Sequence, residues 1–217
     1  MERELIIYGA GGAGRELAFS LSLEKNATKT WNLKGFVDDN MEFYGKIING
    51  LPVLGNTEWL KENGGSVAIT TVGSPLVKRE VVQKLKERAT IDFPKIVGPN
   101  CIISDLAEFG EGCIISLAFN WVSPNVKMGK FVFVNCTTRI GHDAIIGDYS
   151  TVFSGIDISG GVQIGPDCII GSGVTINPLI KIGEGSIIGA GSVVTKDIPS
   201  HVIAAGAPAK VIREIRS

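Results

Sequence analysis

The sequence lacks paired cysteines and has little histidine. None of its four cysteines (Cys101, Cys113, Cys136, Cys168) forms a Cys-x-x-Cys pair, and all four lie among apolar residues. Such cysteines are typical of reduced core positions rather than of disulfides or metal ligands. Only two histidines, His142 and His201, occur in 217 residues. We therefore expect no metal site.

An excess of charge and a long apolar run are also missing. Lys and Arg number 21 against 22 Asp and Glu, for a net charge of -1. This balance gives no bulk electrostatic argument for binding nucleic acid or an anionic membrane. No segment approaches the roughly 20 apolar residues of a membrane helix, and the N-terminus has no signal-peptide pattern. We expect a soluble cytoplasmic protein.

Glycine is abundant, with 28 residues, and residues 1–95 alternate strand and helix patterns. The chain is long enough for one large domain or two small ones. The pattern predicts a strand at 5–8, a glycine turn and helix at 9–21, strands at 33–40 and 66–73, and a helix at 75–88. This alternation predicts a small parallel, Rossmann-like α/β domain over residues 1–95.

From Val97 onward the period changes to six residues. An aliphatic residue or methionine recurs twelve times in one register: Met128, Val134, Ile140, Ile146, Val152, Ile158, Ile164, Ile170, Ile176, Ile182, Ile188 and Val194. Upstream the same spacing holds for Val97, Ile103, Phe109, Ile115 and Trp121, with an offset of one residue expected near Ser123–Pro124. A six-residue period predicts a parallel β-helix over residues 96–217, with five to six triangular coils.

His142 lies inside this repeat, next to an aspartate. Ile140 takes the inward place of its hexad, so we expect His142 at a corner of the coil. The alternative interpretation is a solvated turn histidine. Asp143 favours the protonated imidazole, which would raise the pKa of His142 and make it a stronger base. Acyl transfer to an amine or a hydroxyl requires such a base. His201 has no acidic neighbour and is interpreted as a surface residue.

The whole chain resembles a known family of enzymes. The hexads are similar to those of left-handed β-helix acyltransferases, and "GAGSVVTKDIPSHVIAAGAPAKVIR" resembles the C-terminal signature of the sialic acid O-acetyltransferase and nucleotide-amino-sugar N-acetyltransferase family. The resemblance implies a left-handed coil, a short C-terminal helix and a homotrimer. It also implies that His142 is the general base and Asp143 its acidic partner.

The resemblance also implies a site for acetyl coenzyme A. Motif alignment assigns the pantetheine contacts to Thr151, Ser172 and Ala190, and the amide near the thioester oxygen to Gly160. An amide there would stabilise the developing oxyanion. Relatives often have a histidine where this chain has Thr151. The alternative for all four positions is that they are turn residues only.

The glycine run from Gly9 to Gly14 allows two interpretations. Placed between a strand and a helix, it matches a dinucleotide fingerprint, with Asp38 as the ribose-binding acid. Physically it presents amides and a helix N-terminus to a phosphate. The resemblance instead implies that Gly11, Gly12 and Ala13 hold the diphosphate of a nucleotide-sugar acceptor. It places Asp38, Asp39 and Gly73 near the nucleoside.

The leading hypothesis is acetyl transfer from acetyl coenzyme A to the amine of a nucleotide-linked amino sugar. Sialic acid O-acetylation is the close alternative, because the same base would act on a hydroxyl. A nicotinamide-dependent oxidoreductase is less favoured, since about 95 residues are too few for a complete dinucleotide fold with a hydride-transfer site. A non-catalytic β-helix binding module is disfavoured by the His142–Asp143 pair.

Overall fold

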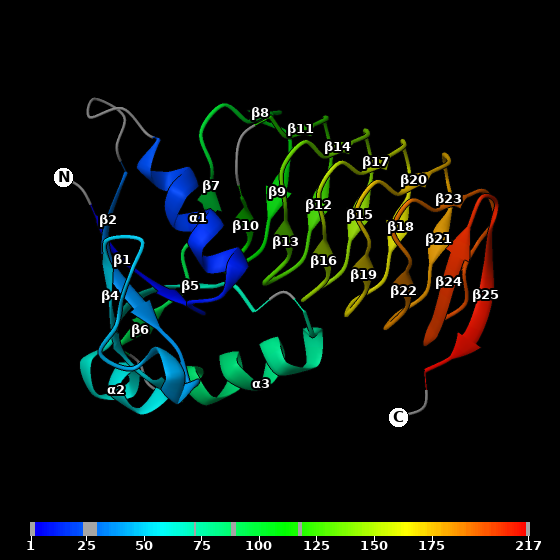
Figure 1. Ribbon diagram of the computed structural model, residues 1–217. Helices are drawn as coiled ribbons and strands as arrows, with labels where there is room; N and C mark the ends of the chain where they lie inside the picture. Colours follow the sequence, from blue (N-terminus) through cyan, green and yellow to red (C-terminus); the bar gives the residue numbers. More distant parts are fainter. Residues whose placement is uncertain (1–2, 24–29, 72, 88–89, 117–118, 216–217) are drawn as a thin grey trace.

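The computed structural model of the protein describes residues 3–23, 30–71, 73–87, 90–116 and 119–215. Figure 1 shows two parts, a helix-flanked sheet at the N-terminal end and a long stack of coils that ends at the C-terminus. The two parts correspond to the two sequence patterns.

The N-terminal part is a six-stranded sheet in the order β3-β4-β2-β1-β5-β6. Its strands are β1 (Arg3–Tyr8), β2 (Trp31–Val37), β3 (Ile47–Ile48), β4 (Leu51–Gly55), β5 (Gly65–Ile69) and β6 (Ile91–Asp92). Every neighbouring pair is parallel except β3 and β4. The helices are α1 (Gly12–Ser22), the short 3-10 helix η1 (Met41–Phe43), α2 (Thr57–Asn63) and α3 (Pro75–Lys86). The predicted α/β architecture is confirmed, with an additional antiparallel hairpin and α2.

The C-terminal part is a parallel β-helix whose strands pair with those 18 or 19 residues away. Its first face holds β7 (Ile96–Val97), β10 (Ile114–Ile115), β13 (Phe133–Val134), β16 (Thr151–Val152), β19 (Ile169–Ile170) and β22 (Ile187–Ile188). The second holds β8 (Ile102–Ile103), β11 (Trp121–Val122), β14 (Arg139–Ile140), β17 (Asp157–Ile158), β20 (Thr175–Ile176) and β23 (Val193–Val194). The third holds β9 (Glu108–Phe109), β12 (Lys127–Met128), β15 (Ile145–Ile146), β18 (Gln163–Ile164) and β21 (Lys181–Ile182).

Three kinds of turn join these faces. Turns from the first face to the second form the serine corner, residues 153–156, 171–174 and 189–192. Turns from the second to the third form the histidine corner, residues 123–126, 141–144, 159–162 and 177–180. Turns from the third to the first form the aromatic corner, residues 129–132, 147–150 and 165–168. Side chains at equivalent turn positions therefore stack along the coils.

The hexad register is confirmed from Met128 onward, but the upstream register was wrong at one point. Val122, not Trp121, occupies the interior, since Val122 is 2% exposed and Trp121 is 50% exposed. Val122 pairs with Ile103 and Ile140, so the extra residue lies between Ile115 and Val122 rather than near Ser123–Pro124. The two residues of a strand point to opposite sides, and the small aliphatic one fits the narrow interior.

The C-terminal helix was also predicted wrongly. Up to Ile215, the tail forms an antiparallel hairpin of β24 (Val202–Gly206) and β25 (Ala209–Glu214). β24 pairs in parallel with β22 and so continues the first face beyond the last coil. The backbone groups of β22 would otherwise face solvent, and pairing satisfies them better than a separate helix would.

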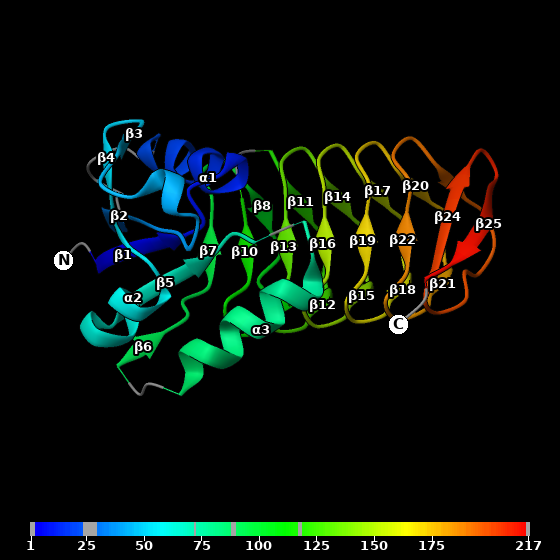
Figure 2. The same ribbon diagram turned by 60° about the horizontal axis from the view of Figure 1, so that its bottom comes forward.

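The N-terminal part covers the start of the first face. The outward side chains of Ile96, Ile114 and Phe133 belong to the same buried cluster as α1 and β1. Helix α3 runs beside the coils at the aromatic corner (Figure 2), where Phe131 and Tyr149 share a cluster with its apolar side. The glycine run at the end of β1 is thereby held over the β-helix.

Candidate functional site

His142 is exposed at the histidine corner, as predicted. Its side chain is 71% exposed and that of Asp143 is 57% exposed. Nδ1 of His142 lies 2.7 Å from Oδ2 of Asp143. A carboxylate accepts hydrogen bonds, so Nδ1 carries the proton and Nε2 keeps its lone pair for a substrate. The hydrogen bond with His142, followed by one from Asn125, lowers the pKa of the Asp143 carboxyl below its usual value.

Gly160 lies directly against this free nitrogen, one coil further along. A Cβ placed on Gly160 would be 2.5 Å from Nε2 of His142, so any side chain there would displace the ring. The Gly160 carbonyl accepts from the Leu179 amide at 3.0 Å, while its own N–H takes part in no hydrogen bond within the described ranges. The histidine corner thus combines a base and an available amide donor.

Asn125 is a contact of this pair that sequence reasoning missed. Its Nδ2 donates to Oδ1 of Asp143 at 2.9 Å from the preceding coil. The two residues are 18 positions apart, which is the coil period, and this spacing was the signal that could have identified the contact.

Two of the predicted coenzyme positions lie together, at a different corner. Ser172 and Ala190 occupy equivalent places in adjacent turns of the serine corner. Within one chain, the whole second face separates them from His142 and Gly160. The structure therefore forms two groups, not one.

Thr151 joins neither group. It is fully buried on the first face, and its Oγ1 accepts a hydrogen bond from Nζ of Lys78 on α3 at 3.2 Å. A coenzyme contact at Thr151 does not fit this burial. Helix α3 could not be placed over the coils from the sequence period, which describes only the interior of the β-helix.

The glycine run forms an open loop at the carboxyl end of β1. Gly11 and Gly12 have no atom within 4 Å of the position a Cβ would take, so the loop is open on the side where a side chain would stand. A Cβ on Gly14 would lie only 1.8 Å from the carbonyl oxygen of Gly9. Because glycine has no Cβ, α1 can pack closely against the end of β1 at this point. Ala13 lies in the first turn of α1. The loop is therefore suited to an anion at a helix N-terminus.

Asp38 and Asp39 hold the backbone around this loop. Asp38 Oδ2 accepts from the Ala10 amide at 2.7 Å, and Oδ1 accepts from the Asn40 amide at 2.8 Å. Asp39 accepts from the Thr57 amide, the Thr57 hydroxyl and the Tyr8 hydroxyl. Burial raises the pKa of the Asp39 carboxyl, but these hydrogen bonds outweigh it, and the pKa lies below its usual value.

Gly73 approaches the same edge from the other side. It follows β5, whose Ile69 pairs with Tyr8 at the end of β1. Strand order reverses between β1 and β5, because β2 lies on one side of β1 and β5 on the other. Ligands of open α/β sheets bind at such a switch point. The loop residues that the sequence analysis grouped are brought together here.

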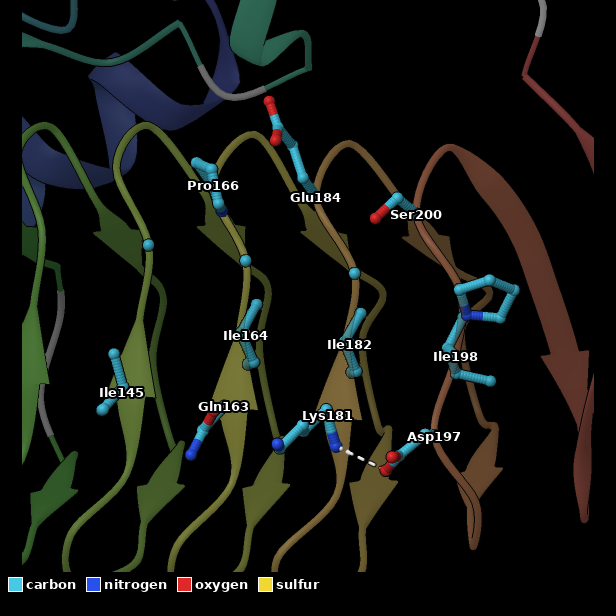
Figure 3. Close-up of a pocket in the computed structure, with 14 residues that line it drawn as sticks. Ile145, Gln163, Ile164, Pro166, Lys181, Ile182, Glu184, Asp197, Ile198 and Ser200 are labelled. Atoms are coloured by element: carbon cyan, nitrogen blue, oxygen red, sulfur yellow. Dashed lines mark hydrogen bonds between the residues drawn. The ribbon is translucent and has the colours of Figure 1, made fainter.

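A groove of about 760 Å³ runs along the third face and into the turns of the aromatic corner. Gln163 and Lys181 lie at one end of its strands, and Pro166, Glu184 and Ser200 lie at the other (Figure 3). The amide of Lys181 donates to Oδ1 of Asp197 at 2.8 Å. Exposed Ile145, the first residue of β15, also lines the groove.

The remaining predicted residues show no catalytic geometry. All four cysteines are free, and burial raises the pKa of the Cys113 and Cys168 thiols to about 11. His201 is exposed near the end of the coils. Over the ranges that the structure covers, no three His, Cys, Asp or Glu side chains gather as a metal site. None of the helices in those ranges has the length and apolar character to cross a membrane.

Both parts of the chain match known families. The PglD N-terminal domain matches residues 4–85, and the bacterial transferase hexapeptide (six repeats) matches residues 161–196. GDP-perosamine N-acetyltransferase of Escherichia coli is 34% identical over 170 residues, which cover 76% of this chain and 73% of that protein.

Solved structures extend the similarity to nearly the full length. The acetyltransferase domain of PglB from Neisseria gonorrhoeae, in complex with acetyl coenzyme A, is 28% identical with a TM-score of 0.85, over 98% of this chain and 100% of that chain. A mutant perosamine N-acetyltransferase from Caulobacter crescentus, in complex with CoA and GDP-perosamine, has the same fold at 24% identity, with a TM-score of 0.85 over 97% of both chains.

Proposed function

The chain belongs to the hexapeptide-repeat sugar acetyltransferases, and on that basis we propose that it acetylates the amino group of a nucleotide-linked amino sugar. It is an acyltransferase that uses acetyl coenzyme A. The amino-sugar acceptor is supported by the similarity to GDP-perosamine N-acetyltransferase. The observation that carries the proposed mechanism is the His142 imidazole, which is fixed by Asp143 through Nδ1 and bordered by Gly160 at Nε2.

The proposed step is a direct attack of the sugar amine on the thioester carbonyl. Nε2 of His142 removes a proton from the amine as the new C–N bond forms. The Gly160 N–H donates to the oxyanion that develops on the carbonyl oxygen. The C–S bond then breaks, the thiolate of coenzyme A takes up the proton, and the products are the N-acetylated sugar and free coenzyme A. Asp143 stabilises the imidazolium while it holds the proton.

The acceptor is proposed to bind through its diphosphate at the glycine loop. The open loop at Gly11 and Gly12, which forms the N-terminus of α1, favours a doubly charged anion. Ala13 takes part through its backbone. Gly73 borders the nucleoside from the neighbouring loop, while Asp38 and Asp39 keep the loop in shape rather than binding directly.

A homotrimer is part of this proposal. His142 and the Ser172–Ala190 pair stand at opposite ends of the second face, so a contact between two chains is the arrangement we propose to bring them to a common thioester. Turning the second face of each chain toward a threefold axis brings the histidine corner of one chain against the serine corner of the next. Exposed Ile102 and Trp121 on this face would be buried there.

An acceptor panel tests the function. Purified chain and acetyl coenzyme A are incubated with GDP- and UDP-linked 4-amino sugars, their 4-hydroxy counterparts and free sialic acid, and thiol release and product mass are followed. We expect acetylation of an amino sugar nucleotide only. Turnover confined to sialic acid would replace this proposal with O-acetylation, and turnover of no acceptor would contradict both.

A further inference from the structure

The carboxylate that holds His142 is itself held from the other side. Oδ2 of Asp143 faces Nδ1 of His142, and Oδ1 accepts from Nδ2 of Asn125. The two carboxylate oxygens therefore have different partners, in different coils. A single hydrogen bond would leave an exposed carboxyl group free to rotate about its terminal torsion, which has a broad energy profile.

The β-helix backbone places these side chains in register. Asn125 and Asp143 occupy equivalent places of the histidine corner, and both adopt the left-handed conformation, with φ of 62° and 59°. Asn and Asp tolerate this conformation better than other residues with a side chain. Stacking of the coils then sets the asparagine amide beside the carboxylate at 2.9 Å.

Asparagine is chemically suited to this place. Its amide donates a hydrogen bond without adding a positive charge. The carboxylate thus keeps its full attraction for an imidazolium, which a lysine in place of Asn125 would weaken by competing for the same charge.

We propose that Asn125 is a positioning residue for the transfer step, which orients the Asp143 carboxylate and thereby fixes the His142 ring with Nε2 free. This inference rests on the proposed role of His142. Asn125 touches neither substrate in this arrangement and acts only through Asp143.

Two substitutions separate orientation from backbone shape. Asn125→Gly keeps the left-handed turn but removes the donor, and Asn125→Asp keeps the side-chain size but puts a second carboxylate beside Asp143. We expect Asn125→Gly to lower kcat about tenfold, the rate equivalent of weakening one hydrogen bond to a charged group, with KM for both substrates unchanged. Asn125→Asp should lower kcat further, because like charges repel.

Asn100→Gly provides the matched control. Asn100 is another exposed asparagine in the left-handed conformation, with φ of 58°, in the first coil. Its replacement should leave kcat and KM at wild-type values. A loss of activity in this variant equal to that of Asn125→Gly would show that any such turn change disturbs the enzyme, and would overturn the positioning role.

A double-mutant cycle gives the decisive readout. Once Asp143→Gly has removed the carboxylate and kept the left-handed turn, adding Asn125→Gly should cause no further loss of kcat. Additive losses, or an unchanged kcat in Asn125→Gly alone, would overturn the inference. His142→Ala in the same panel tests the base separately, since wild-type turnover in that variant contradicts the proposed function whatever Asn125 does.

Imidazole NMR adds a signature that folding alone would not change. The chain has only two histidines, so ¹⁵N signals can be assigned by comparison with a His201→Gln variant. In the wild type, Nδ1 of neutral His142 should carry the proton. In Asn125→Gly, the two tautomers should mix, and an unaltered spectrum would contradict the inference.

Discussion

At His142, one ring nitrogen faces Asp143 and the other lies over Gly160. His142→Ala removes the base but leaves an exposed corner position. We expect kcat to fall by about 10²–10⁴-fold, the usual contribution of general-base catalysis. The melting temperature should be nearly unchanged, because the exposed His142 side chain makes few packing contacts. Steady-state thiol release and a melting curve on the same sample check both parts, and unchanged turnover would exclude His142 as the base.

Gly160 provides a second test at the scale of one methyl group. Gly160→Ala places a Cβ 2.5 Å from Nε2, and the exposed ring can move away at little cost in stability. We expect activity to fall toward the level of His142→Ala while the melting temperature stays within a few degrees. The equivalent positions of the histidine corner hold side chains in the other coils, namely Pro124, His142 and Pro178, so the turn itself accepts a Cβ.

The His142→Ala background supplies the control for this change. Without the ring there is no clash, so the double variant should be no less active than His142→Ala alone. A Gly160→Ala enzyme with wild-type kcat would show that catalysis does not depend on the present position of the His142 ring.

At the scale of elements, α3 is joined to the β-helix by a buried lysine. Lys78 is 1% exposed, and its Nζ donates to the carbonyls of Phe131 and Tyr149 and to the hydroxyl of Thr151. Burial lowers the pKa of the Lys78 ammonium to about 7. Nearby, Arg79 pairs with Asp167 at 2.7 Å and lies over the Tyr149 ring.

The folded state should gain stability as pH rises from 7 to 9. In that range an unfolded lysine stays protonated, while folded Lys78 loses its proton, so the unfolded state binds more protons and the free energy of unfolding increases with pH. We expect a gain of about 2 kcal/mol in the wild type relative to Lys78→Met over these two pH units. Urea unfolding at several pH values measures the difference.

Buried thiols limit the upper end of this window. The pKa of both Cys113 and Cys168 is raised by burial, so above pH 9 the unfolded thiols ionise first and the free energy of unfolding falls again. Lys78→Met should show this fall without the preceding rise. Parallel pH curves for the two proteins would contradict the assignment to Lys78.

At the scale of the whole molecule, the proposed site is shared between two chains. We expect a trimer by sedimentation, with the second faces around the axis. Trp121→Glu should disrupt it, because Trp121 is half-exposed in one chain and its loss does not disturb the interior. The variant should remain folded, dissociate and lose most activity. A fully active monomer would contradict the shared site.

Mixed trimers test the same arrangement more directly. His142→Ala chains lack the base, and Ala190→Trp chains have a blocked serine corner, so each should be inactive alone. Mixing after dissociation should restore part of the activity, because a hybrid contains one site with both corners intact. No recovery, although mass analysis shows hybrids, would mean that both corners act within one chain.

The local pattern of the chain was enough to predict the β-helix, the glycine loop and the corner place of His142. A six-residue period describes which side chains enter a narrow interior, and that depends on neighbours close in sequence. The run from Met128 to Val194 was read correctly for this reason. The same logic failed at Trp121, where apolar character alone did not reveal which of two adjacent residues faces inward.

Tertiary structure decided what lies outside the interior, since those contacts join residues that no period relates. Burial of Thr151 follows from Lys78 reaching over it from α3, 73 positions away in sequence. Asp38 and Asp39 serve the loop backbone because β2, α2 and the end of β1 meet there. The tail became a hairpin because β22 left an edge to pair, and only the stacked coils create that edge.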